Sequence, residues 1–407
     1  MSVEEDNGKI NIKEKKKKFH MIENDEQELE QKIRKHRMRN LRKTLIILGI
    51  LCAILFGLYI FFEMKTFTDY RVVRETERSD TAATKFENFQ GNILKYSNDG
   101  AFYTDLTDHM IWNQTYEMQN PTLDTCEGYM TIYDKGGTNL YILDKTGLQG
   151  NIKTTMPIFQ VCVASQGTVA VLMEAEGVSH LQMYDKSGTL LASGELHQEN
   201  SGYPLAIALS YDAKKLAVSM LAINEGKAET TIAFYNFGSV GQNEIDNIVA
   251  SYIYKDQIFP ELEFLSNNRM IALGDSEIVS YEGTQKPKLV QTIELKKEIK
   301  SVFYNEEYIG IVSNKGENNS TRHIEVYDWK GKSILSKNVK MDYTNIEFLE
   351  NNEICITNDT ECRIYSLYGV ERFHYTFEKE LYKVFSGVTQ MDYTFILDGT
   401  TEKVKIK

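Results

Sequence analysis

The motif that decides the fold reads YILDKTG at residues 141–147 and QMYDKSG at residues 182–188. Each copy is an apolar and aromatic strand that ends in a polar residue and a turn containing glycine. Further copies are AFYNFG (233–238), IVSYEG (278–283), EVYDWKG (325–331) and RIYSLYG (363–369), with a weaker one at AFYTDLTD (101–108). A carboxylate or amide can bond the backbone two residues on, and glycine accepts positive φ. The motif therefore predicts turns between strands, not a set of ligands.

The spacing of the motif identifies the repeating unit. The polar positions are Asp105, Asp144, Asp185, Asn236, Glu282, Asp328 and Ser366, which recur on average every (366 − 105)/6, or 43.5, residues. Four of the five prolines, Pro121, Pro157, Pro204 and Pro260, each open an apolar strand that follows one copy. Proline is tolerated at the first residue of a strand. Each period then holds four short strands, which is typical of a propeller blade of about 40–45 residues.

The ends of the repeat region set the number of blades. Residues 70–407 divided by 43.5 give 7.8 units, so we predict an all-β, eight-bladed β-propeller, with seven blades as the alternative. The last unit stops one strand short, whereas residues 70–78 (YRVVRETER) form a strand that belongs to no following blade. We expect this strand to pair with residues 404–407 and to close the last blade.

A hydrophobic segment precedes the repeats. Residues 44–62 read TLIILGILCAILFGLYIFF, without a charge. At about 1.5 Å per residue, nineteen helical residues span roughly the 30 Å core of a bilayer. A cleavable signal has a shorter apolar run and a small-residue cleavage site, which residues 63–65 do not offer. The sequence predicts an uncleaved transmembrane helix, followed by a short linker at 63–69.

The cations near the two ends of this segment predict its orientation, because Lys and Arg resist translocation. Residues 24–43 hold seven Lys and Arg, whereas residues 63–82 hold four. We expect residues 1–43 in the cytoplasm, partly disordered with a helix at 23–43, and the propeller outside the cell membrane. The helix would either rest on lipid headgroups or dock a cytoplasmic partner.

Charge and composition narrow the classes of partner. The net charge is −12, and residues 1–43 hold 13 Lys and Arg against 9 Asp and Glu, which leaves about −16 for the remainder. An acidic domain argues against nucleic acid as a partner. The seven histidines show no ligand spacing, and no nucleophile elbow, phosphate-binding glycine loop or zinc motif is present. We therefore expect no catalytic residue, no cofactor and no metal.

The cysteines are few and carry two separate expectations. Cys126 and Cys162 each lie five residues after a strand-opening proline, where the next two units have Leu209 and Leu265. An apolar core position explains all four. Cys355 and Cys362 flank an Asn-Asp turn, which would place them opposite each other and predicts a cross-strand disulfide in an oxidising compartment.

Two polar insertions are the candidate partner-binding loops. They run from Asn224 to Thr230 and from Asn314 to Thr321, both between the second and third strands of their blades. Such loops emerge on one face of a propeller. The residues expected to contact a partner are Asn224, Glu225, Lys227, Lys315, Glu317 and Asn318. The alternative is that both insertions are solvated loop tips.

Three stretches resemble a known family. They are WNQTYEMQNP (112–121), YPLAIALS (203–210) and FYNFGSVGQ (234–242), and the resemblance extends from about residue 45 to the end. They are similar to a domain-of-unknown-function family of membrane-anchored proteins in Gram-positive bacteria. The resemblance implies one N-terminal helix and a propeller-like ectodomain, and it brings no activity or site residues.

Three classes of function remain open. The first is a binding or scaffold protein of the cell envelope, held by the lipid bilayer and contacting an envelope protein. The second is a sensor that couples an external ligand to the cytoplasmic tail. The third is a quinoprotein-like or hydrolytic enzyme, which predicts a polar, carboxylate-lined pocket at the channel of the propeller. Because propellers host many functions, only a site can decide among them.

Overall fold

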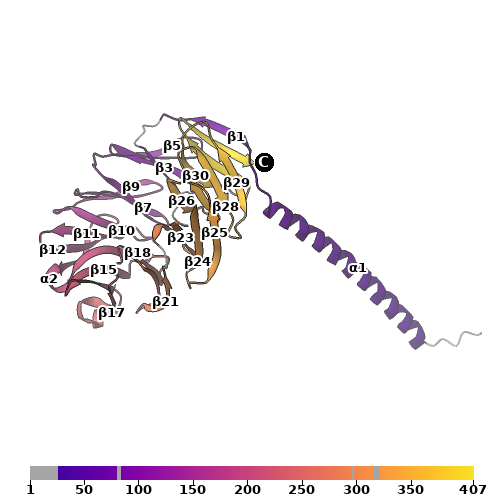
Figure 1. The fold of residues 1–407 in the computed structure, drawn as a ribbon, viewed down its shortest axis with the longest axis horizontal. Helices are drawn as coiled ribbons and strands as arrows, with labels where there is room; N and C mark the ends of the chain where they lie inside the picture. Colours follow the sequence, from indigo (N-terminus) through magenta and orange to yellow (C-terminus); the bar gives the residue numbers. More distant parts are fainter. Residues whose placement is uncertain (1–25, 80–83, 296–297, 315–320) are drawn as a thin grey trace, which may run out of the picture. The chain divides into compact units, whose positions relative to one another are not determined.

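A computed structural model of the chain describes residues 26–79, 84–295, 298–314 and 321–407. By its contacts the chain separates into two units, Met1–Glu63 and Met64–Lys407. The first contains the helix α1 (Glu26–Glu63), and the second contains almost only strands (Figure 1).

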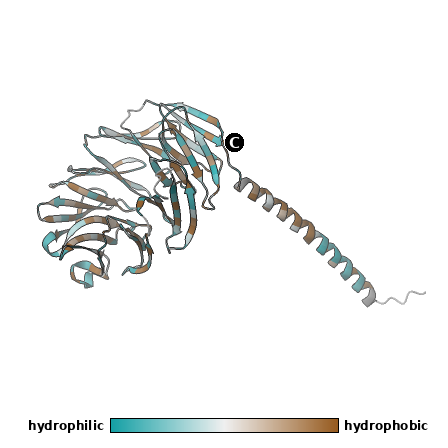
Figure 2. Cartoon of the chain, viewed as in Figure 1, coloured by the Kyte–Doolittle hydropathy of each residue, from teal (hydrophilic) through white to brown (hydrophobic). Residues whose placement is uncertain are grey.

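Helix α1 is continuous over 38 residues. The expected cytoplasmic helix and the expected membrane segment are therefore parts of one helix, whose N-terminal half is hydrophilic and whose C-terminal half is hydrophobic (Figure 2). The stretch Leu29–Leu58 is long and apolar enough to cross a membrane, a test that a signal sequence also passes. The expected disorder of the first residues lies outside the described part of the chain.

The second unit consists of eight sheets of four strands each, which we number as blades 1–8. Blade 1 contains β2 (Lys85–Phe89), β3 (Asn92–Ser97), β4 (Gly100–Thr104) and β5 (Met110–Thr115). Blade 2 contains β6 (Pro121–Cys126), β7 (Tyr129–Asp134), β8 (Asn139–Asp144) and β9 (Gly147–Lys153). Blade 3 contains β10 (Ile158–Val163), β11 (Val169–Ala175), β12 (Val178–Tyr184) and β13 (Leu190–His197). Blade 4 contains β14 (Tyr203–Leu209), β15 (Lys215–Asn224), β16 (Lys227–Asn236) and β17 (Ile248–Lys255).

The second half of the ring continues the same order. Blade 5 contains β18 (Glu261–Phe264), β19 (Arg269–Leu273), β20 (Glu277–Glu282) and β21 (Lys288–Glu294). Blade 6 contains β22 (Ile299–Tyr304), β23 (Tyr308–Asn314), β24 (Arg322–Asp328) and β25 (Ser333–Val339). Blade 7 contains β26 (Asn345–Phe348), β27 (Ile354–Thr357), β28 (Glu361–Tyr365) and β29 (Glu371–Thr376). Blade 8 contains β30 (Leu381–Ser386), β31 (Asp392–Leu397), β32 (Thr400–Ile406) and β1 (Tyr70–Glu77). Short helical segments are α2 (Gln198–Ser201), η1 (Gly241–Asn243) and η2 (Ile245–Asn247).

The N-terminal strand completes the last blade. Strand β1 pairs antiparallel with β32, so that Tyr70 lies opposite Ile406 and Glu77 lies opposite Thr400. Beyond the strand, the guanidinium of Arg78 donates to the carbonyls of Thr400 and Leu397 at 2.8 and 2.9 Å. The eight-bladed propeller is thereby confirmed, and the seven-bladed alternative is wrong.

The turn motif does what its residue types predict. In blade 3 one carboxylate oxygen of Asp185 accepts the backbone N–H groups of Ser187 and Thr189, each at 2.9 Å. In blade 6 Asp328 accepts the N–H groups of Lys330 and Lys332 at 3.0 and 2.9 Å. These carboxylates are occupied in ordering the turn between the third and fourth strands.

The two faces of the ring differ in the turns that they carry. One face carries the turns from first to second and from third to fourth strand, and β1 begins there because Tyr70 pairs with the end of β32. We call it the entry face. The opposite face carries the turns from second to third strand, including the turn of the β15–β16 hairpin, and we call it the hairpin face.

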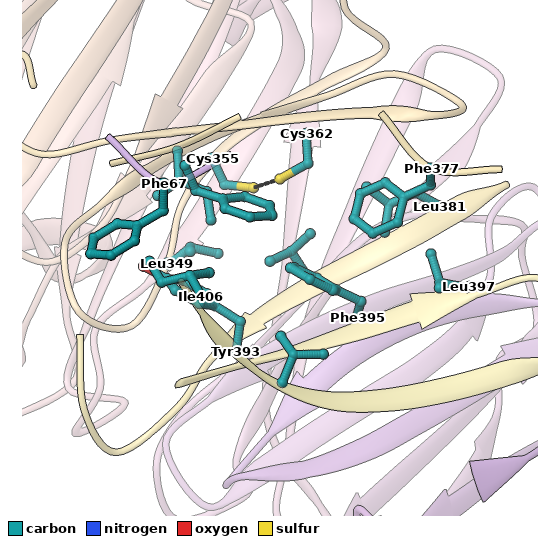
Figure 3. Close-up of a cluster of buried hydrophobic side chains, with 14 residues drawn as sticks. Phe67, Leu349, Cys355, Cys362, Phe377, Leu381, Tyr393, Phe395, Leu397 and Ile406 are labelled. Carbon is teal, nitrogen blue, oxygen red and sulfur yellow. Dashed lines mark hydrogen bonds between the residues drawn. The ribbon is translucent and has the colours of Figure 1, made fainter. Parts of the chain in front are cut away.

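Apolar side chains fill the spaces between neighbouring blades. The space between blades 7 and 8 holds one such cluster, which includes Phe377, Phe395 and Leu397 and is drawn in Figure 3. The ring of Tyr70 joins it, with its centroid 4.9 Å from that of Tyr375 and 5.3 Å from that of Phe395. Closure of the ring is therefore held by aromatic packing as well as by the strand pairing.

The predicted linker at 63–69 is held by the propeller at Phe67. Phe67 is 3% exposed and forms a parallel bridge with Phe373 of β29. Its N–H donates to the carbonyl of Arg372 at 2.9 Å, and its carbonyl accepts the N–H of His374 at 3.0 Å. The ordered contacts of the propeller thus begin three residues before β1, on blade 7.

Candidate functional site

The first predicted insertion is an extension of a hairpin. Strands β15 and β16 pair through ten residues up to Asn224 and Lys227. Glu225 and Gly226 have φ values of 53° and 81°, and two positive φ values are the requirement of a tight two-residue hairpin turn. The first residue of β14, Tyr203, pairs with Leu221. Strand β15 therefore continues three residues past the start of β14, to Asn224.

The predicted contact residues at this hairpin are engaged in local bonds. The side-chain amide of Asn224 donates to Glu229 at 3.0 Å, and the ammonium of Lys227 lies 3.1 Å from a carboxylate oxygen of Asp256. Glu225 occupies the turn itself. These interactions stiffen the hairpin, so the polar residues serve the shape of the tip.

Sequence reasoning missed two apolar residues on the same blade. Ile223, next to the turn, is 66% exposed, and Ile253 on the outer strand β17 is 62% exposed. The signal was present, because the strand pattern of residues 215–224 continues unbroken into the supposed polar insertion. The end of this paired hairpin therefore presents an exposed isoleucine next to its turn.

The second insertion lies mostly outside the described residues, and Lys315, Glu317 and Asn318 belong to that part. The described residues on either side of that part, Asn314 and Arg322, pair with each other at the hairpin-face end of blade 6.

The centre of the ring is lined by the first strand of each blade, and several of these strands contact one another. A cavity of about 20 Å³ lies among β6, β10, β14 and β18, with Asp124, Cys126, Cys162, Leu209 and Glu263 in its lining. That volume holds about one water molecule. The channel is polar and carries carboxylates, as the enzyme class predicted, but the cavity has no room for a substrate.

Two carboxylates in this channel have raised pKa values. Loss of hydration raises the pKa of Asp124 to about 7, although the backbone N–H of Val163 donates to it at 2.7 Å. Loss of hydration, together with repulsion from Asp124 and Glu261, raises the pKa of Glu263 to about 8. The hydroxyl of Tyr304 donates to Glu261 at 2.9 Å and lies 3.4 Å from Glu263.

The opposite side of the channel carries a cation between two acids. The ammonium of Lys383 in blade 8 lies 2.9 Å from Glu347 of blade 7 and 2.9 Å from Glu87 of blade 1. Loss of hydration lowers the pKa of Lys383, but the attraction of both acids outweighs it and raises the pKa above its usual value. One lysine therefore ties three blades together.

Other polar side chains of the inner strands also join blade to blade. Gln160 of blade 3 donates to the carbonyl of Ile207 in blade 4 at 3.0 Å and accepts its N–H at 2.9 Å. Ser301 of blade 6 and Tyr343, which precedes blade 7, share a hydrogen bond of 2.8 Å. Among these polar groups, Gln160 and Asp124 bond backbone groups of the neighbouring inner strand, which is a structural role.

Cys126 and Cys162 pack in hydrophobic clusters, as predicted, with Cys126 7% exposed and Cys162 half-buried. Both also line the small cavity beside Asp124 and Glu263. Loss of hydration raises the pKa of the Cys126 thiol to about 12. A thiol held neutral in this way is a poor nucleophile.

Contrary to the prediction, Cys355 and Cys362 do not lie directly opposite each other. The turn between them has three residues, so Cys355 faces Ile364 and Cys362 faces Thr357. The two sulfurs are diagonal neighbours 4.0 Å apart, and both cysteines are free and buried (Figure 3).

Among the described residues, no group of three His, Cys, Asp or Glu side chains is arranged to hold a metal ion.

Solved structures with a similar fold are propellers of low sequence identity. The C-terminal WD40 domain of Sif2 is 12% identical at a TM-score of 0.57, over 84% of this chain and 100% of that one. Sqt1 from Saccharomyces cerevisiae is 12% identical at a TM-score of 0.50, with the same coverage. BamB from Moraxella catarrhalis is 12% identical at a TM-score of 0.49, over 83% of this chain and all of that one. At this identity the likeness concerns the fold alone.

No curated protein matches the chain in sequence. A family model does match it, over residues 63–406, which include the end of α1, the segment around Phe67 and the propeller up to the last residue of β32. The matched region is most of the chain. The protein therefore belongs to the family of unknown function DUF5711.

Proposed function

We propose that the chain is a membrane-anchored binding or scaffold protein that holds a protein partner of the cell envelope on its hairpin face. The observation that carries the proposal is the extended β15–β16 hairpin, which is paired up to its two-residue turn and presents Ile223 with 66% of its surface exposed. An exposed apolar side chain on a stiff element suits a protein contact, because little conformational entropy is lost on binding.

The channel supports binding over catalysis. Its cavity of about 20 Å³ is smaller than any substrate pocket, and its polar groups are bonded between blades. The proposal places α1 in the cell membrane with residues 1–43 in the cytoplasm, for which the excess of cations before the apolar segment is the support. The family resemblance supports two further parts of the proposal, namely that the cell is Gram-positive and that the propeller lies outside the membrane.

A photo-crosslinking amino acid tests the proposal in intact cells. The reporter is placed at Ile223 on the hairpin face or, as the matched control, at Tyr368, which is 86% exposed in a turn on the entry face. We expect one discrete adduct with a second protein from position 223 and none from position 368. Ile223→Glu in the same cells should abolish co-purification of that protein. Equal adducts at both positions, or none at 223, would overturn the proposal.

A sensor is the second candidate function, and the contact of Phe67 with Phe373 of blade 7 favours it. The chain passes from α1 to a buried contact on blade 7 within four residues, so few residues are free between Glu63 and the ordered propeller. Replacing residues 1–43 by an unrelated basic sequence separates the two. A scaffold retains its partner and cellular effect after this replacement, whereas a sensor retains the partner and loses the effect.

A further inference from the structure

A large groove lies between blades 5 and 6, away from the central channel. Its volume is about 540 Å³, within the usual range of pockets that bind small molecules or single peptide side chains. The lining comes from β21 on one side and from β22, β23 and β24 on the other. The lining residues are Thr292, Glu294, Leu295, Ile299, Ile311, Ser313, Glu325 and Tyr327.

The groove exists because one small residue stands where other blades have a large one. In blades 3, 4, 6 and 8, the first strand has a bulge near its start, after the first paired residue in blades 3, 6 and 8 and after the second in blade 4, so their registers can be aligned at the bulge. The residue opposite the last paired position before the bulge is Met173 in blade 3, Met220 in blade 4, Leu397 in blade 8 and Ser313 in blade 6. The three large side chains are buried and fill the space toward the preceding blade.

The groove is polar in a specific way. Ser313 is 3% exposed, and its hydroxyl oxygen has no hydrogen-bond partner among the described residues. Burying a hydroxyl without a hydrogen-bond partner is unfavourable, so a ligand that bonds to it recovers part of that cost. The charged side chains in the lining are the carboxylates Glu294 and Glu325. A ring nitrogen of His323 lies 3.6 Å from a carboxylate oxygen of Glu325.

Apolar side chains complete the lining, with Ile299 and Ile311 at the floor of the interface between the two blades. The groove reaches the hairpin face, because Ser313 directly precedes the last residue of β23 and Ile299 is the first residue of β22. It is therefore available to a protein that also contacts the β15–β16 hairpin.

We propose that this groove receives a lysine or arginine side chain of the bound protein, flanked by aliphatic residues. The inference rests on the proposed function, since it gives the chemistry of the partner at the hairpin face. The cation lies between Glu294 and Glu325 and donates to the Ser313 hydroxyl, while the aliphatic stem covers Ile299 and Ile311. A cationic side chain with a long apolar stem matches both parts of the lining.

The test uses the full chain in detergent micelles and two acetylated tripeptide amides, Leu-Lys-Leu and Leu-Glu-Leu. We expect saturable binding of Leu-Lys-Leu by calorimetry and at least tenfold weaker binding of Leu-Glu-Leu. Ser313→Met, which copies the side chain of blades 3 and 4, should weaken Leu-Lys-Leu at least tenfold. Glu325→Gln should weaken it several-fold. Ser333→Met, an exposed position on β25 of the same blade, is the matched control and should bind like the unmodified chain.

Absence of saturable binding of Leu-Lys-Leu, or equal binding of the two peptides, would overturn the inference. So would unchanged binding by Ser313→Met, whose folding is checked by its thermal unfolding. The crosslink at Ile223 is read separately. An adduct at Ile223 together with a groove that binds neither peptide leaves the proposed function standing and overturns the inference about the groove. Peptide binding without any adduct at Ile223 supports the chemistry of the groove and overturns the proposed envelope partner at the hairpin.

Discussion

The space between blades 7 and 8 and the space between blades 5 and 6 are built from the same register positions and differ in what fills them. At the first, Phe395 and Leu397 of β31 pack among Phe373, Phe377 and Leu381. At the second, Ile311 and Ser313 of β23 occupy the equivalent positions and leave about 540 Å³ open. Tyr70 of the closing strand β1 also packs into the first space, which we call the seam. The second space is lined by residues of blades 5 and 6 and receives no side chain of the closing strand.

The inner ends of the two spaces differ in charge as well. At the seam, Lys383 lies 2.9 Å from Glu347, whereas between blades 5 and 6 Glu263 lies beside the hydroxyl of Tyr304 and is repelled by Asp124 and Glu261, with a pKa of about 8. One repeat thus produces a tightly closed interface and a less completely satisfied one. The difference teaches that equivalent blades share a backbone plan and that individual side chains decide which space is available for binding.

The largest expected effect comes from opening the seam. Phe395 is fully buried and its ring contacts those of Tyr70, Phe373 and Phe377. Phe395→Ala should lower the free energy of unfolding by about 3–5 kcal/mol, because the cavity cannot collapse around several fixed rings. Denaturant titration of the full chain in detergent measures the change. Ile253→Ala, at an exposed position, serves as the control, and equal effects of the two would contradict the role given to the seam.

Making the seam resemble the groove is the next test. Leu397→Ser places the side chain of blade 6 in blade 8 and should cost about 2–5 kcal/mol, from the lost apolar contacts and an added buried hydroxyl. The same titration reports it. If the variant unfolds like the original chain, the two register positions do not carry the difference that we assign to them.

The raised pKa of Glu263 in blade 5 predicts that the stability of the chain depends on pH. Glu263 has a pKa of about 8 in the folded chain and an ordinary value of 4.5, so the folded state keeps its proton longer than the unfolded state does. Stability should therefore fall as the pH rises from about 4.5 to 8. Glu263→Gln should remove part of that fall and be the more stable form at pH 9, by on the order of 1–2 kcal/mol after allowance for solvent screening.

Thermal unfolding of both forms between pH 5 and pH 9 measures this effect. Glu282→Gln, at an exposed position of the same blade, is the control and should be as stable at pH 9 as the unmodified chain. A parallel pH profile for Glu263→Gln and the unmodified chain would show that Glu263 does not titrate in this range.

The smallest expected effect comes from filling the groove. Ser313→Met supplies the side chain of blades 3 and 4 and removes an unpartnered buried hydroxyl, so it should stabilise the chain by about 0.5–2 kcal/mol. Thermal unfolding is the measurement, with Ser333→Met as control. A loss of stability would mean that the space is too constrained for methionine and that its shape differs from the equivalent spaces.

Much of the fold followed from local chemistry. Asp185 and Asp328 order turns because a carboxylate reaches the backbone two residues on, and this depends on neighbours in the chain. The missing strand of the last unit pointed to Tyr70–Glu77, which pairs with β32. The sequence also placed the first candidate loop in the correct turn, but took a paired hairpin for a polar insertion and passed over Ile223.

The candidate sites were less accessible to sequence reasoning. The approach of Asp124 to Glu263 joins blades 2 and 5, and the contact of Lys383 with Glu87 joins blades 8 and 1 across almost the whole propeller sequence. The diagonal placement of Cys355 and Cys362 depended on a turn of three residues in place of two. A side-chain period of two makes such a shift decisive for which residues face each other.

By itself, the sequence determined the apolar segment, the repeat, the four strands per blade and the number of blades, because these depend on composition and on periods that local sterics set. The tertiary structure alone decided which side chains meet between blades. The bracing of Phe67 on blade 7, the ties across the channel and the open space beside Ser313 all arise from contacts between distant residues. An empty space between blades has no sequence motif, because it is defined by side chains that lie far apart in the sequence.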